Sequence, residues 1–367
     1  MDNLTHTLFA VTLGRTPLGR AGRGTTAALV LASNAPDIDF ITTAGGAVNY
    51  LKWHRGPTHG PLGIVGLGLA AAALVWAGQR FNRRWKDESP DASFLMLFVI
   101  SMIGVLFHIL MDLPTSYGSR ILSPFDWHWF AFDWMPIVDI YLLIVLMAGM
   151  LFGRGSADAR RRNATIVLVL MAANYGVRAV AHHQALALVP RVFGPTLPAR
   201  CDPAAPETLL DSWPRPTAPP RPAARTRCLV EAAALPSFSS PFSWRIVAQF
   251  SNAYELRDID ILDARLRGAG EDTDVPWRTN VRYPNVWTPA VATAATTATG
   301  GVFLGFSRFP AARSVEDPQH VMTVRITDMR FVAGPAPVDS PLRRDNLFTA
   351  RVRIGPDGRV LDEALGR

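Results

Sequence analysis

Histidine and aspartate residues gather in short motifs within the first third of the chain. Five of the eight histidines precede residue 130. The motifs lie at residues 5–6 (TH), 34–39 (NAPDID), 54–60 (HRGPTHG) and 108–112 (HILMD). Imidazole nitrogens and carboxylate oxygens together form ligand sets that suit Zn, Mn or Fe(II). Packing alone explains such a set poorly, so the motifs predict a metal centre.

His108 and Asp112 are four residues apart, which places both side chains on one face of a helix. An isolated pair of this kind is more often a polar contact within a bundle. The surrounding run is apolar, however, and ionisable groups inside an apolar span are costly and mark functional sites. The pair is therefore interpreted as part of the metal centre.

The other motifs are weaker taken singly. Asp37 and Asp39 can bind one ion or bridge two, although a solvated turn also explains an isolated Asp-x-Asp. His54 and His59 enclose a Gly-Pro pair, which predicts a turn that brings two imidazoles together. Arg55, between them, is available for an anionic ligand.

The candidate metal ligands are His6, Asp37, Asp39, His54, His59, His108 and Asp112. These exceed the three or four protein ligands of one zinc site, so the number of divalent ions, one or two, is left open. Zn is the favoured ion, with Mn or Fe as alternatives. The candidate catalytic residues are Asp39, as general base, and Arg55, as the group that holds a substrate phosphate.

The elements that must position these residues are apolar helices. The chain has 49% hydrophobic and only 18% charged residues, and the apolar residues concentrate before about residue 190. Residues 61–79, 93–113, 135–153 and 164–189 predict four membrane spans, since about 20 apolar residues cross a bilayer. Residues 3–14 and 25–39 are too short, and fit a helical hairpin, a re-entrant pair or a packed bundle element.

Loop charges predict the orientation of these spans. Basic residues follow the first short segment, the first span and the third span: Arg15, Arg20, Arg23, Arg80, Arg83, Arg84, Lys86, Arg154 and Arg160 to Arg162. The positive-inside rule makes these loops cytoplasmic. All the ligand motifs, and residues 190–367, then fall on the external side. The chain opens without a secretory signal pattern, so insertion is expected to rely on internal helices.

The remainder of the chain predicts a different kind of structure. Residues 1–190 are interpreted as the helical membrane domain, 191–235 as a Pro-rich linker or irregular segment, and 236–367 as a small β-rich extramembrane domain. Strands are predicted at 244–250, 302–306, 321–326 and 347–354, with a turn at 355–358. Cys201 and Cys228 are the only cysteines, and a disulfide and free thiols are equally compatible with them.

The motifs occur in the order found in the YdjM-like family of membrane-bound, predicted metal-dependent hydrolases, which the chain resembles over about residues 1–190. The resemblance implies a multi-span domain of the bacterial inner membrane and a metal site at the seven candidate ligands. Two positions depart from the common family pattern. Gly60 replaces a Ser after the second His of the HRGxTH motif, and Asp139 is followed by Ile140 where Pro is common.

The favoured function is hydrolysis of a phosphoester, or of a lipid or envelope-derived substrate, by a metal-activated water. An alternative is a non-enzymatic membrane protein with a structural metal or polar cluster and a partner-binding β-domain. A transporter is a third reading, but the polar residues gather at one end of the spans and no internal repeat is visible. The expected partner is the lipid bilayer and not nucleic acid, because Arg residues flank apolar runs and do not alternate with exposed aromatics. The oligomeric state is left open.

Overall fold

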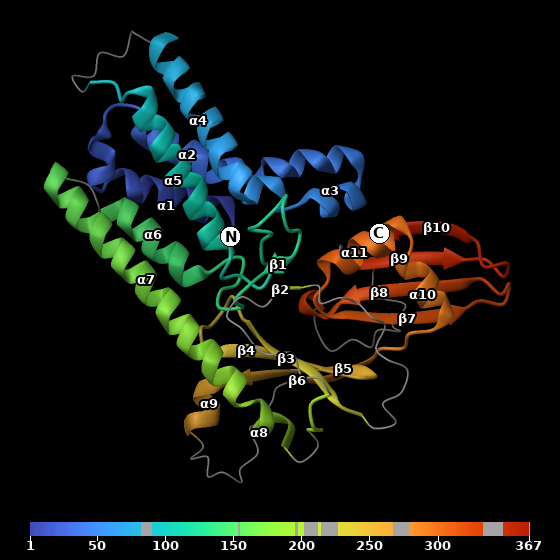
Figure 1. Cartoon of the computed structure of the whole chain (residues 1–367). Helices are drawn as coiled ribbons and strands as arrows, with labels where there is room; N and C mark the ends of the chain where they lie inside the picture. Colours follow the sequence, from blue (N-terminus) through green and yellow to red (C-terminus); the bar gives the residue numbers. More distant parts are fainter. Residues whose placement is uncertain are drawn as a thin grey trace. The chain divides into compact units, whose positions relative to one another are not determined.

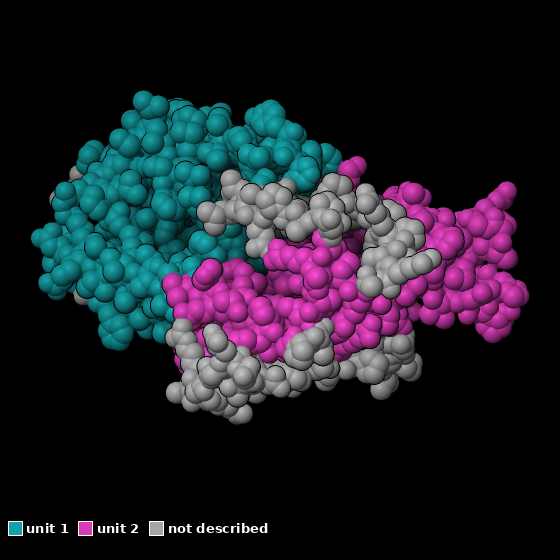
Figure 2. Space-filling view, turned by 60° about the horizontal axis from the view of Figure 1, so that its bottom comes forward, with its two compact units in different colours: residues 1–41, 53–179 teal, residues 42–52, 180–367 magenta. Residues whose placement is uncertain are grey.

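The computed structural model describes residues 1–81, 90–152, 155–194, 197–201, 212–213, 227–266, 279–332 and 348–366. The chain forms two compact units, residues 1–41 with 53–179 and residues 42–52 with 180–367 (Figure 2). The basic residues Arg83, Arg84, Lys86 and Arg154 and the Pro-rich stretch 214–222 lie outside the described residues.

The first unit is helical (Figure 1). Its regular elements are α1 (Asn3–Gly14), η1 (Pro17–Ala21), α2 (Thr25–Asn34), η3 (Pro57–His59), α4 (Pro61–Phe81), α5 (Phe94–Asp112), the short strand β1 (Trp129–Phe130) and α6 (Ile140–Phe152). Three elements also contribute residues to the second unit: the 3₁₀ helix η2 (Ala35–Gly45), α3 (Ala47–Trp53) and α7 (Ala157–Ala187).

Among the described residues, three helices are long and apolar enough to cross a membrane: α4, α5 and α7. They match three of the predicted spans. The fourth predicted span, 135–153, is helical only over the 13 residues of α6, so the count of four is not confirmed. The helix starts late because Asp139 caps it, its Oδ1 accepting a hydrogen bond from the amide of Leu142 at 2.8 Å.

The two short N-terminal segments are helices that pack within this bundle. α1 contacts α2 and α6, and α2 contacts α4 and α5. Small residues permit the close approach of α2 to α5, since a Cβ atom added at Gly104 would lie 2.9 Å from the Cβ of Ala32. Residues 35–39 do not continue α2, because Pro36 has no amide N–H for the helical ladder and the chain passes into η2.

The basic segments that the described residues include meet at one end of the bundle. The Arg15 guanidinium donates to the carbonyl of Gly149 at 3.0 Å, and Asn163 donates to the same carbonyl at 2.7 Å. Arg23 pairs with Asp91 at 2.6 Å, just ahead of α5. The ends of α2 and α5 and the start of α4, which carry the ligand motifs, form the opposite end.

The second unit is rich in β-sheet. Its elements are α8 (Val189–Phe193), β2 (Ser212–Trp213), β3 (Leu229–Pro236), β4 (Ser243–Phe250), β5 (Ala253–Asp260), α9 (Ile261–Leu266), β6 (Thr279–Pro284), α10 (Pro289–Ala295), α11 (Ala298–Phe306), β7 (Pro310–Glu316), β8 (Met322–Asp328), η5 (Met329–Phe331), β9 (Thr349–Ile354) and β10 (Val360–Leu365). Two antiparallel four-stranded sheets have the orders β3-β4-β5-β6 and β10-β9-β8-β7.

The sequence prediction of these strands is confirmed at β4, β8 and β9, and the turn at 355–358 joins β9 to β10. The prediction of a strand at 302–306 is wrong, because these residues belong to α11. Thr297 caps that helix by accepting from the Gly300 amide at 3.0 Å, and the buried Gly300, Phe303 and Leu304 follow helical spacing. A short apolar run does not distinguish helix from strand by itself.

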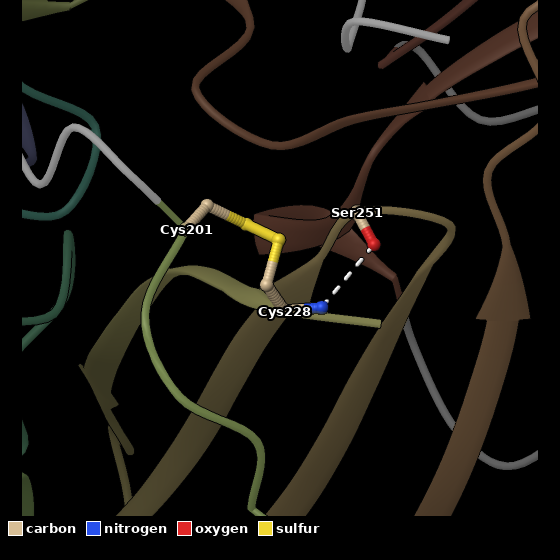
Figure 3. Close-up of a disulfide and its surroundings, with 3 residues drawn as sticks. All are labelled: Cys201, Cys228 and Ser251. Atoms are coloured by element: carbon tan, nitrogen blue, oxygen red, sulfur yellow. Dashed lines mark hydrogen bonds between the residues drawn. A yellow bond between two sulfur atoms is a disulfide. The ribbon is translucent and has the colours of Figure 1, made fainter. Parts of the chain in front are cut away.

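Cys201 and Cys228 form a disulfide, with their Cα atoms 5.0 Å apart (Figure 3). The amide of Cys228 also donates to the hydroxyl of Ser251 at 3.4 Å. Of the two states that the sequence left open, the structure has the bonded one.

Candidate metal centre

Four side chains from three segments converge at the ligand end of the bundle. They are Asp37 of η2, His59 of η3, and His108 and Asp112 of the last turn of α5. One potential ligand atom from each lies within 4.8 Å of all the others. His59, His108 and Asp112 are fully buried, whereas the side chain of Asp37 is 22% exposed. Of these four side chains, Asp37 is therefore the one that solvent reaches.

The spacing of these atoms matches tetrahedral coordination. The Nε2 atoms of His59 and His108 are 3.2 Å apart, and each lies 3.5 Å from Oδ2 of Asp112. Oδ1 of Asp37 is 3.6 Å from His108 Nε2 and 3.9 Å from His59 Nε2. Zinc–ligand bonds of about 2.0–2.1 Å give tetrahedral edges of about 3.3–3.4 Å. Five of the six distances between the ligand atoms are therefore close to these edges, and all four atoms lie within 4.8 Å of one another.

The contacts of His108 fix which of its nitrogens faces the cluster. Its Nδ1 lies 2.7 Å from the backbone carbonyl of Ser33. A carbonyl only accepts hydrogen bonds, so Nδ1 carries the proton and, in the neutral ring, Nε2 presents a lone pair. Backbone carbonyls often orient metal-binding histidines in this way. The close packing of α5 on α2 at Gly104, one turn earlier, brings the Ser33 carbonyl within reach.

His59 has a similar arrangement. Its Nδ1 is 3.0 Å from the Thr58 hydroxyl and 3.9 Å from Oδ2 of Asp39, and its Nε2 faces His108. An Nδ1–H that donates to Thr58 leaves the Nε2 lone pair for the cluster. With Nδ1 protonated on both rings, the two Nε2 lone pairs, 3.2 Å apart, repel each other unless a cation lies between them. With Nε2 protonated on His59, the same contact is a hydrogen bond to His108. The first of these states is the one that binds a cation.

Burial determines the charge states of the histidine and aspartate side chains that lie outside the membrane spans. It lowers the pKa of His59 well below its usual value, with the positive charge of Arg55 acting in the same direction. It also lowers the pKa of His54 and of His6, and it raises that of Asp37. Neutral imidazole is the form that binds metals. These histidines are ready to act as ligands at neutral pH.

Unsatisfied polar atoms give a second test of the fit. Both ring nitrogens of His6 are buried and have no hydrogen-bond partner among the described residues, and the buried Oδ2 of Asp112 has the guanidinium of Arg55 as its ion-pair partner. Buried polar groups are otherwise almost always satisfied. The cluster offers two imidazole nitrogens and two carboxylate oxygens, a donor set that suits a divalent ion. The residues present thus fit a metal.

Asp39 and His54 pair with each other beside the cluster. Nδ1 of His54 lies 3.2 Å from Oδ2 of Asp39, and the same oxygen accepts from the backbone amide of Arg55 at 2.6 Å. Arg55 has a φ of 50°, a left-handed conformation that is rare for residues other than Gly. Strain of this kind persists where surrounding contacts hold it, often at functional sites. Asp39 is one of those contacts.

The guanidinium of Arg55 borders the cluster. Its Nη2 lies 3.0 Å from Oδ2 of Asp112, its Nη1 donates to the carbonyl of Gly118 at 2.7 Å, and it stacks 4.8 Å above the ring of Tyr117. A fixed cation therefore stands next to the oxygen that faces the candidate ion. This arrangement suits an anionic group that approaches the ion.

The structure thus separates the seven predicted ligands into three sets. Asp37, His59, His108 and Asp112 form the cluster. His6 stacks on His108 with ring centroids 3.9 Å apart, and its Nε2 is 3.5 Å from the other oxygen of Asp112, which also pairs with the amino group of Met1. Asp39 and His54 make the neighbouring pair.

Two contributors to the site were missed by the sequence analysis. The Ser33 carbonyl is a backbone group, and no side-chain pattern reveals it. Arg120 donates its amide to the carbonyl of Arg55 at 3.2 Å and stacks over Trp129 at 4.6 Å. Arg120 is the only Arg or Lys in the loop 114–136, and this isolated positive charge could have marked it as a residue of the site. Burial lowers its pKa to about 10.

Gly60, one of the two departures from the family pattern, lies against the backbone of the loop after α5. A Cβ atom added there would lie 1.8 Å from the carbonyl oxygen of Ser123. Any larger residue requires one of the two backbones to move. Asp139, the other departure, pairs with Arg178 of α7 at 2.5 Å and does not join the cluster.

Comparisons with known proteins agree with the helical unit and its motifs. The sequence model of a family described as "YdjM inner membrane protein" matches residues 1–185. A curated relative, the uncharacterized protein YfhP of Bacillus subtilis (strain 168), is 25% identical over 158 residues, which are 41% of this chain and 45% of that protein. The match therefore spans less than half of the relative's length.

Proposed function

Since this chain belongs to the YdjM inner membrane protein family, we propose that it is a membrane-bound, metal-dependent hydrolase that cleaves phosphoesters. The observation that carries the proposal is the cluster of Asp37, His59, His108 and Asp112, whose ligand atoms lie within 4.8 Å of one another beside Arg55. Zn is the proposed ion, with Mn or Fe as alternatives.

We assign different roles to the four residues of the cluster. His59, His108 and Asp112 are fully buried and hold the ion. Asp37 stands at the exposed side, and burial raises its pKa, which suits a general base that takes a proton from the attacking water. A bound divalent ion would supply Lewis acidity, lowering the pKa of water and polarising a phosphoryl oxygen.

From the sequence, Asp39 was both a candidate metal ligand and the candidate general base. Its carboxylate contacts the ring of His54 and accepts a hydrogen bond from the Arg55 amide. We therefore assign it the role of positioning Arg55 and not that of general base. The Arg55 guanidinium, 3.0 Å from Asp112 Oδ2, is placed to hold a substrate phosphate and to balance the charge that develops on it. Arg is suited to this task because its planar fork binds two phosphate oxygens at once.

For the topology, we propose that the ligand end of the bundle faces the periplasm and the basic end faces the cytoplasm. α6 is then the fourth crossing. At about 1.5 Å per residue its helix reaches only about 20 Å, so the non-helical residues before it, among them the buried Met135 and Asp139, complete the crossing. The second unit follows α7 on the external side. The disulfide supports this, because disulfides persist in oxidising compartments.

Purified full-length protein tests the proposal. Metal content and hydrolysis of bis(p-nitrophenyl) phosphate are measured for the wild type and for H108A, D37N and D126N. H108A should lose the ion and the activity. D37N should keep the ion and lose about 10²–10⁴-fold in kcat. D126N is the matched control, because Asp126 is exposed and pairs with His128. If H108A keeps both metal and activity, the proposed centre is wrong.

A second candidate function is a structural metal site in a non-enzymatic membrane protein. Four protein ligands within reach of one point favour it, since structural zinc sites are saturated by protein ligands. The D37N variant separates the two. In a structural site it weakens metal binding and lowers the melting temperature, and no phosphoester is hydrolysed by the wild type.

A further inference from the structure

The 3₁₀ helix η2 turns apolar side chains outward directly beside the metal ligands. With three residues per turn, Pro36 and Asp39 share its buried face. Ile38, Phe40 and Ile41 point the other way and are 57%, 68% and 68% exposed. Runs of 3₁₀ helix as long as these 11 residues are uncommon. Three large apolar side chains therefore flank Asp37, the one ligand of the cluster that solvent reaches.

The depth of the cluster along the spans indicates what meets these side chains. His108 and Asp112 lie in the last turn of α5, and His59 stands two residues before the first residue of α4. Both helices are candidate membrane spans. Where α4 and α5 cross the hydrocarbon, the cluster lies at the level of the lipid headgroups. Apolar side chains exposed at that level contact acyl chains.

A second apolar segment borders the same motif from the loop after α5. Leu122, Phe125 and Trp127 are exposed, Phe125 to 77%. This loop contacts the HRGPTHG segment through the hydrogen bond of Arg120 to Arg55 and through the close approach of Ser123 to Gly60. Two exposed apolar segments thus adjoin the motifs that carry the polar cluster, an arrangement that matches an amphiphile with a charged head.

We propose that the substrate is a long-chain lipid phosphoester. Its phosphate enters past Asp37 toward Arg55, and its acyl chains stay in the bilayer against Ile38, Phe40 and Ile41. This inference rests on the proposed function and names its substrate class. It predicts that η2 enters the membrane, which is measurable without any turnover.

The activity test compares two substrates. Full-length protein and its F40S/I41S variant are assayed on a long-chain phospholipid in mixed micelles and on bis(p-nitrophenyl) phosphate. The variant should show at least a tenfold rise in KM for the phospholipid, with kcat on the soluble ester unchanged within twofold. The single variant F40L keeps an apolar side chain at position 40 and leaves Ile41 unchanged, so its KM for the phospholipid should equal that of the wild type. V315S, which removes an exposed apolar side chain of β7, is the control and should change neither.

The second test measures the position of η2 directly. Cys201 and Cys228 are bonded to each other, so F40C adds a single thiol for a bimane label. In proteoliposomes, lipids with brominated acyl chains should quench this label, and should leave a label at V315C unquenched. An unquenched F40C label, or equal losses on both substrates in F40S/I41S, overturns the inference. If the wild type cleaves no phosphoester while the label is quenched, the proposed function fails and the bilayer contact of η2 stands.

Discussion

Replacing Gly60 by Ala tests whether the metal centre depends on the geometry described above. The added Cβ would lie 1.8 Å from the Ser123 carbonyl oxygen, whereas real Cβ atoms stay at least 3.0 Å from such neighbours. The backbone fixes the position of the Cβ and the oxygen is a backbone atom, so no side-chain rotation relieves the overlap. The loop after α5 or the turn that carries His59 must shift.

The required shift is about 1.2 Å, the difference between those two distances. His59 is the adjacent residue, and a metal–nitrogen bond is only about 2.0–2.1 Å long. A displacement of this size moves Nε2 out of bonding range or strains the turn. Overpacking typically costs about 1–3 kcal/mol of stability. We therefore expect zinc affinity to fall by about 10–100-fold, the range found when groups that orient ligands are changed.

The assay is a zinc titration against a competing chelator, together with thermal unfolding. G66A is the matched control: it lies in α4, and a Cβ atom there meets nothing within 4 Å. Gly to Ala inside a helix is expected to stabilise by about 0.5–1 kcal/mol. If G60A binds zinc within twofold of the wild type and G66A, then the contact of Gly60 with Ser123 does not position His59.

Three further predictions follow from other contacts. R178M removes the ion-pair partner of the buried Asp139 carboxylate and should lower the free energy of unfolding by about 3–5 kcal/mol. R178M/D139N removes that charge but keeps the cap on α6, so thermal unfolding should show that most of the lost stability returns. C201S/C228S removes the disulfide, which joins residues 27 positions apart, and should lower the free energy of unfolding by about 3–4 kcal/mol. A thiol-reactive polymer should shift the wild-type band on a gel only after the disulfide is reduced. Chelation should lower the melting temperature, since free ion at 100 times Kd contributes about 2.7 kcal/mol, and added zinc should restore it.

The part of the site that lies on regular helix was predictable from the sequence. His108 and Asp112 are four residues apart on a long apolar helix, so their common face follows from helical geometry. The loop charges then predicted which helix ends lie on the same side of the bundle. The contacts of Arg15 and Arg23 agree with this prediction at the basic end. Local periodicity carries this information without any tertiary contact.

The sequence did not predict which residues of the other motifs join the cluster and which support it. Asp37 and Asp39 look equivalent in the sequence, yet the three-residue period of η2 sends Asp39 to the buried face and leaves Asp37 at the cluster. The positive φ of Arg55 depends on tertiary contacts that no local pattern records. In the second unit, the run 302–306 was too short for its period to decide between strand and helix.

Asp37, at the exposed side of the cluster, and the apolar side chains beside it depend on one backbone conformation. In a 3₁₀ helix each residue turns the chain by about 120°, so every third side chain shares a face. The sequence NAPDIDFI uses this period: Pro36 and Asp39 face inward, Asp37 lies in line with Phe40, and Ile38 lies in line with Ile41. An α-helix turns by about 100° per residue and would rotate Phe40 out of line with Asp37. The same eight residues therefore specify both the open side of the metal centre and the apolar surface that borders it.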